Sequence, residues 1–249
     1  MGTTRTLAEF AANLKYVDIP ASVRARAIHA IIDAMGTVLA GLEEASVLQV
    51  RNLVAREMRA GQSTVLGTSL RLAASGAAMA NGAAAHALDY DNISLTVSGF
   101  VASPVLFALL AVAEEEDSVS GTRLLEAFVT GWEVESAIAR GLGVHHYAKG
   151  WHSTSTLAHF GAAVGVGKLL GFDARQMQHA IGTAAAEASG MRTMLGNMLN
   201  PFHLGKAARN GVVAARLVQA GFTANPEVLE TGWGSARCST GPATTTWPP

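Results

Sequence analysis

Alanine and glycine make up most of the segment from Leu72 to Leu88, and this composition restricts the possible fold more than any other feature of the chain. A helix built from such small residues lets the backbones of neighbouring helices come close. The segment therefore predicts a tightly packed helical core.

Three chemically active residues lie where this predicted helix ends: His86, Asp89 and Asp91. Asp89 follows His86 by three residues, so both side chains project from one face if the helix continues. A buried carboxylate costs free energy unless it is paired. Each acid is therefore either a structural hydrogen-bonding group or a proton-transfer group, and spacing alone leaves both interpretations open.

The rest of the chain reads as one helix after another, and the predicted fold class is all-α. An acid and a proline within Asp18–Pro20 indicate a helix start, and Gly41 ends that helix. Further helices are predicted over 46–58, 72–88, 104–115, 120–140, 154–170, 173–188 and 203–220, with a loop over 141–150 and at most one strand over 63–67.

We predict one helical domain over residues 1–230 and an irregular tail over residues 231–249. Gly, Ser, Thr and Pro dominate the tail, and the apolar periodicity of the helices stops there. The tail is interpreted as an unstructured end or as the product of a coding frame that has left its original path.

The composition and net charge limit the kinds of partner that this chain can bind. Hydrophobic residues are 49% of the chain and charged residues 15%, which favours burial of part of the surface in a homodimer. The net charge of -1 gives no basis for nucleic-acid binding. The single Cys238, with no apolar signal core at the N-terminus, predicts a reducing, cytoplasmic location. The uncharged run 93–113 is interpreted as a loop leading into a buried helix, not as a membrane span.

Several short motifs carry a family resemblance because they follow one another in a fixed order. They are Asp18-Ile19-Pro20, Asp33-Ala34-Met35-Gly36, Leu39-Ala40-Gly41, Asn81-Gly82 through Asp91, Gly150-Trp151-His152-Ser153-Thr154, Gly161-Ala162-Ala163, Lys168-Leu169-Leu170-Gly171, His203-Leu204-Gly205-Lys206-Ala207-Ala208 and Gly221-Phe222-Thr223. On these residues the chain, from about residue 7 to Glu230, resembles the amino-terminal helical domain of the MmgE/PrpD family. That family includes 2-methylcitrate dehydratase, cis-aconitate decarboxylase and an iminodisuccinate epimerase.

The resemblance implies a helical domain that carries much of an active site, followed in longer members by a smaller α+β domain. It also implies a dimer, small carboxylic-acid substrates, and no metal or organic cofactor. Residue by residue, it implies catalytic roles for Asp89, His152 and His203. The candidate substrate-binding residues are His86, Asp91, Arg192, Asn200 and Lys206.

Two positions depart from the family pattern. Many members have a histidine where this chain has Phe100, and a lysine where it has Asn200. Replacing the lysine removes a positive charge from an anion site, and replacing the histidine removes a proton-transfer group. Because the second domain of the longer members also has no counterpart in this sequence, we expect the chain alone to turn over little or no carboxylic acid.

Three functions remain open. The first is a lyase of the dehydratase or decarboxylase type acting on a small di- or tricarboxylic acid. The second is an isomerase or epimerase on the same scaffold. The third is a non-catalytic helical domain that dimerises or binds a partner.

The candidate residues also have structural interpretations. His86 can serve as a packing or capping residue, and Arg192 can pair with Glu187. The set His145, His146 and His152 matches no standard zinc spacing, so no metal site is predicted. Residues 161–168 resemble a phosphate loop only superficially, because Leu169 replaces the Ser or Thr that would hold magnesium.

Overall fold

The described part of the chain is built almost entirely from helices. The computed structural model describes residues 2–232, 234, 235 and 238. The helices are α1 (Thr3–Asn13), α2 (Ala21–Ala40), α3 (Ala45–Glu57), α4 (Ala74–Ala85), α5 (Ala102–Ala113), α6 (Gly121–Ala148), α7 (Ser153–Leu169), α8 (Ala174–Glu187) and α9 (Leu199–Gln219), with two 3-10 turns at Tyr16–Asp18 and Arg192–Met194.

Strands are short in the described residues. β1 (Ala60–Thr64) pairs with β2 (Arg71–Leu72), and β3 (Ile93–Ser94) pairs with β4 (Gly99–Phe100), each as a two-stranded antiparallel ribbon. Because these two ribbons are small additions to a helical body, the predicted all-α class is confirmed.

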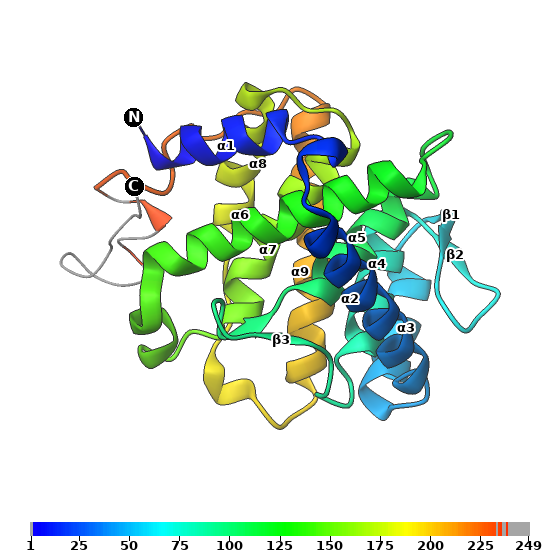
Figure 1. Cartoon of the computed structure of the whole chain (residues 1–249). Helices are drawn as coiled ribbons and strands as arrows, with labels where there is room; N and C mark the ends of the chain where they lie inside the picture. The colour runs from blue at the N-terminus through cyan, green and yellow to red at the C-terminus, as the bar shows by residue number, and fades with distance from the viewer. Residues whose placement is uncertain (1, 233, 236–237, 239–249) are drawn as a thin grey trace.

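Small residues allow the central helices to pack closely, as the composition predicted. Every residue of α4 from Gly76 to Ala85 is buried, and a β-carbon on Gly82 would lie only 3.0 Å from the Cα atom of Gly205 in α9. α7 is buried along nearly its whole length. Figure 1 shows α6 as the long green helix that crosses the molecule, with α7 and α9 behind it.

The two ends of the domain lie against each other. The backbone N–H of Thr4 in α1 donates to Oε2 of Glu230 at 3.2 Å, and Leu229 is buried. Residues up to Glu230 therefore belong to the packed body. Most of the predicted irregular tail lies outside the described residues, so the boundary at 230 stays a prediction.

Three local expectations were wrong or incomplete. The predicted loop over 141–150 is helical up to Ala148, with a break at Gly143, where φ is 59° and ψ is -166°. The last helix begins at Leu199 instead of His203, because the first turn of a helix accepts Pro201 without losing a backbone hydrogen bond. The helix α1 was not predicted.

One finding bears on membranes. Within the described residues, no single helix combines the length and the apolar composition needed to cross a bilayer. α2 and α3 pass that test only as a pair, and the pair is bent by 91°.

Candidate functional site

The first part of the candidate site is the polypeptide that follows α4. The helix ends at Ala85, and His86 is its C-cap residue. Asp89 has a φ of 54°, in the left-handed region that few non-glycine residues adopt. The expectation that His86 and Asp89 share one helical face is therefore wrong, because the backbone has already left the helix.

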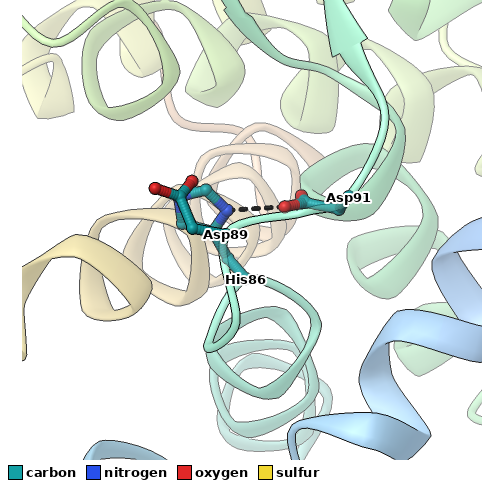
Figure 2. A group of neighbouring side chains, drawn as sticks. All are labelled: His86, Asp89 and Asp91. Atoms are coloured by element: carbon teal, nitrogen blue, oxygen red, sulfur yellow. Dashed lines mark hydrogen bonds and ion pairs between the residues drawn. The ribbon is translucent and has the colours of Figure 1, made fainter. Parts of the chain in front are cut away.

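The turn nevertheless brings both acids to the imidazole of His86, as Figure 2 shows. Nδ1 of His86 lies 2.7 Å from Oδ1 of Asp91, and Nε2 lies 3.5 Å from Oδ1 of Asp89. The side chains of His86 and Asp91 are 0% and 1% exposed, whereas that of Asp89 is 55% exposed. A buried His–Asp pair thus supports a carboxylate that faces outward.

This environment favours the charged form of His86. Burial alone would lower the pKa of His86, but the hydrogen bond to Asp91 and the charges of Asp91 and Asp89 outweigh it, so the pKa is raised. Burial raises the pKa of Asp91, while its bond to His86 acts in the opposite direction. We place the shared proton of the pair on His86, beside the C-terminal end of α4, which also favours a cation.

Asn200 and Phe100, the two departures from the family pattern, both adjoin His86. Asn200 is buried in the first turn of α9, and its side chain acts to raise the pKa of His86, but in the described residues Nε2 of His86 and Oδ1 of Asn200 both lack a hydrogen-bond partner. The Phe100 ring centroid lies 4.4 Å from that of His86. The backbone N–H of Phe100 also donates to Oγ1 of Thr154, at 3.0 Å, and so ties β4 to the start of α7.

The second part of the site is a pair of imidazoles. Nδ1 of His152 lies 3.0 Å from Nδ1 of His203, with the ring centroids 5.2 Å apart. Both residues are buried. The pKa of each is lowered to about 4, chiefly by burial, with the charges of His86 and Lys206 acting on both rings. Both are therefore neutral at pH 7.

The His152–His203 pair lies at the N-terminal ends of two helices. His152 is the N-cap of α7, while Asn200 and His203 belong to the first two turns of α9. The N-terminal end of a helix carries partial positive charge and attracts anions. The three predicted catalytic residues thus lie where α7 and α9 begin and α4 ends.

The remaining predicted binding residues differ in position. Nζ of Lys206 donates to the backbone oxygen of Ser189 at 2.6 Å, and burial lowers the pKa of Lys206. Arg192 stacks on the ring of Tyr147, with its Cζ atom 4.3 Å from the ring centroid. In the described residues Arg192 forms no ion pair with Glu187, so that structural interpretation is wrong.

One group of side chains has the spacing of metal ligands. Within the described residues, the set that brings three ligand-type atoms within 4.8 Å of one another is His86, Asp89 and Asp91. The earlier candidates do not converge: Nε2 of His146 bonds Oγ1 of Thr156 at 2.6 Å, and His152 bonds His203. The absence of a metal requirement stays a prediction.

Two buried titratable residues are not among the site residues predicted from the sequence. Glu135 of α6 is fully buried, and both of its carboxylate oxygens lack a partner in the described residues. His159 of α7 is equally buried, and neither ring nitrogen has a partner there. The burial of Glu135 could have been predicted from the sequence, because helical spacing places it on the apolar face formed by Phe128, Gly131 and Ile138.

Comparison with known proteins gives a consistent family assignment. Residues 5–248 match the family model described as the MmgE/PrpD N-terminal domain, a range that includes most of the predicted tail. Cis-aconitate decarboxylase of Aspergillus terreus is 31% identical over 242 residues, which cover 94% of this chain and 49% of that protein. Cis-aconitate decarboxylase of Homo sapiens is 32% identical over 180 residues, covering 70% of this chain and 37% of that protein.

The chain thus spans about half the length of the Aspergillus relative, at 49%. The match to the family model runs through α1 to α9, and it includes every candidate site residue described above. The chain belongs to the MmgE/PrpD family, in the part described as its N-terminal domain.

Proposed function

We propose that this chain carries the helical part of a lyase site for small di- or tricarboxylic acids. One observation carries the proposal: the His152–His203 pair lies where α7 and α9 begin, close enough to the His86–Asp91 pair for the charge of His86 to act on both rings. The relatives named cis-aconitate decarboxylase support the same reaction class.

The chemistry of decarboxylation and dehydration explains why this set of groups fits. Both reactions form negative charge on carbon next to a carboxylate, so a site needs positive potential and a group that moves a proton. Two helix N-termini and the charged His86 supply the potential. His152 and His203 supply the proton-transfer group.

Asp89 has a distinct role in this proposal. Its carboxylate is exposed, yet Oδ1 lies 3.5 Å from Nε2 of His86. We assign Asp89 to orienting the substrate or accepting its proton, with His86 and Asp91 holding it in place. His86, Asp91, Arg192, Asn200 and Lys206 are proposed to bind or position the substrate.

The test is turnover of cis-aconitate and methylcitrate by the purified chain, followed as release of carbon dioxide and as loss of water. Asp89→Asn should lower any turnover by on the order of a hundredfold or more. Asp117→Asn is the matched control, because Asp117 is exposed beyond the far end of α5 from Phe100. If the chain turns over neither acid, the lyase proposal fails.

The alternatives separate in the same assay. An isomerase or epimerase would exchange substrate hydrogen with deuterated water and lose neither carbon dioxide nor water. A non-catalytic domain would bind a carboxylic acid, or a partner, without turnover. We propose weak turnover for the unmodified chain, because Asn200 and Phe100 stand beside His86 where a cation and a second imidazole are common in the family.

We also propose a homodimer formed through the outer face of α2. Ile28, Ile32 and Leu39 are exposed there at spacings of four and seven residues, which puts them on one stripe of the helix. Exposed apolar residues gathered on one face favour burial against a second surface.

A further inference from the structure

We propose that His152 and His203 act as one two-site proton relay, which holds opposite tautomers and takes up a proton at one Nε2 atom while releasing a proton at the other. This inference deepens the proposed function, and its catalytic part rests on that function. Its structural part, the pairing of tautomers, stands without it.

The distance between the rings requires a shared proton. The two Nδ1 atoms lie 3.0 Å apart, which is the usual length of a hydrogen bond between nitrogens. Two bare nitrogens at this distance would repel through their lone pairs, and two N–H groups would clash. One ring therefore donates from Nδ1 and the other accepts.

Neutral imidazole carries a single N–H, so the bond fixes both tautomers. The donor ring holds its proton on Nδ1 and leaves Nε2 as a bare acceptor. The acceptor ring has a bare Nδ1 and holds its proton on Nε2. Burial, the nearby charges of His86 and Lys206, and the neighbouring imidazole keep the pKa of His152 low at about 4, so the neutral description applies at pH 7.

The two Nε2 atoms are available to a ligand. Within the described residues neither has a hydrogen-bond partner, and neither belongs to the fully buried unpartnered atoms. His203 places its Nε2 beside Gly190, where a β-carbon would come within 3.5 Å of it. The pair thus offers the site one acceptor nitrogen and one donor N–H.

The relay balances one proton in and one proton out. The bare Nε2 of the donor ring takes a proton from the substrate, and that ring becomes an imidazolium. Its Nδ1 proton then moves to Nδ1 of the other ring, which becomes the imidazolium and releases its own Nε2 proton. The pair ends neutral with its tautomers exchanged, and no oxidant or second reactant is needed.

Such a relay suits elimination and decarboxylation. Elimination removes a proton from carbon and adds one to the leaving oxygen, and decarboxylation must deliver a proton to the carbon that has lost carbon dioxide. A relay with two open nitrogens can serve two substrate atoms without a proton from bulk water at each step. His86 takes no part in this proton exchange, because its own Nδ1 atom is hydrogen-bonded to Asp91.

The tautomers are tested by nitrogen-15 spectroscopy of the histidine-labelled full chain at pH 7. We expect the His152 and His203 rings to show opposite tautomers, or jointly averaged shifts whose changes mirror each other. In His152→Phe and His203→Phe, at least one surviving ring should change its tautomer, while exposed His29 is the internal control. Identical tautomers in the wild-type pair, or no change in either variant, would overturn the relay.

The catalytic part is tested by comparing single and double variants. If the two rings act as one unit, His152→Phe, His203→Phe and the double variant lose similar amounts of kcat, on the order of 10²- to 10⁴-fold. If the loss of kcat in the double variant is instead the product of the two single losses, the rings act independently. That result overturns the relay but leaves the lyase proposal standing. A chain with the paired tautomers but no turnover would overturn the proposed function and the catalytic part, while the tautomer pairing remains.

Discussion

At the scale of single residues, Asn200 and Phe100 both act on the same imidazole. Phe100 packs its ring 4.4 Å from that of His86, and the Asn200 amide raises the pKa of His86. The two positions at which the sequence departs from the family pattern are therefore adjacent in space. A lysine at position 200 would bring a second cation close to His86, where the chain now has a neutral amide.

We expect Asn200→Lys to lower the pKa of His86, because like charges disfavour each other, and to tighten binding of a carboxylic acid by about tenfold or more, equivalent to about 1.4 kcal/mol. Calorimetry with cis-aconitate and an NMR titration of His86 measure the two effects. Gln219→Lys is the control, because it adds the same charge at the last residue of α9. Equal gains in both variants would show that net charge alone is responsible.

Buried Glu135 should lower stability in a pH-dependent way. Complete burial raises its pKa well above 4.5, so between pH 4.5 and the folded pKa the unfolded chain releases a proton that the folded chain keeps. The free energy of unfolding therefore falls as pH rises through this range. We expect Glu135→Leu to raise stability by about 1–3 kcal/mol at pH 7.5 and by less at pH 5, measured by urea denaturation.

Glu135→Gln separates the two contributions to this effect. It removes the ionisation but keeps an unpartnered polar group, so it should abolish the pH dependence and recover only part of the gain. A large loss of stability in the Leu variant would mean that the carboxyl group has a partner in solution.

The sequence named the candidate site residues but not their geometry. Ordered motifs put His152 and His203 among the candidates, yet their contact joins residues 51 positions apart, which no local pattern encodes. Asp89 was expected on a helical face and reaches His86 through a left-handed turn instead. Glu135, by contrast, could have been found from its spacing on an apolar helix face.

At the scale of elements, the helices were predictable and their breaks were not. The helix predicted over 173–188 is α8, and the side chain of Asp173 caps it by accepting from the backbone N–H of Gln176 at 2.8 Å, which confirms the predicted start. Gly143 falls within the loop that the sequence predicts over 141–150. Here the helix resumes after one residue, since that residue alone adopts the unusual backbone conformation.

Gly143→Ala tests this break. At a φ of 59° and a ψ of -166°, a β-carbon is strained, so we expect a loss of about 1–3 kcal/mol in the free energy of unfolding. The change should also disturb the bond from His146 to Thr156. Gly121→Ala is the control in the same helix, since its β-carbon would meet nothing within 4 Å, and a gain of up to about 1 kcal/mol is expected. A Gly143 variant as stable as wild type would contradict the strain argument.

At the scale of the whole molecule, the exposed stripe on α2 is the place to test assembly. If a homodimer buries this stripe, Ile32→Glu should shift sedimentation at micromolar concentration from dimer to monomer, because a buried unpaired charge is costly. Val17→Glu is the control: Val17 is also exposed but lies in the turn before α2. A wild-type chain that sediments as a monomer would refute the dimer.

Acid should unfold this protein because its packed body holds four neutral histidines. The pKa is lowered to about 4 for His146, His152 and His203 and to about 3 for His159, with burial the largest cause for each. Unfolding restores an ordinary pKa near 6.5, so below that pH the unfolded chain binds more protons than the folded one. Stability therefore decreases as pH falls from 6.5 towards 4, by up to about 1.4 kcal/mol per pH unit for each ring.

His159 offers the cleanest way to measure this effect, because it lies outside the proposed relay and neither of its ring nitrogens has a partner in the described residues. His159→Leu should reduce the slope of stability against pH by about one proton between pH 6 and 4, and it should also remove two unsatisfied polar atoms. Urea denaturation at a series of pH values gives both the slope and the offset. Exposed His29→Leu is the control for replacing a histidine by leucine, and a slope in the His159 variant equal to that of wild type would show that its ring is not held neutral by burial.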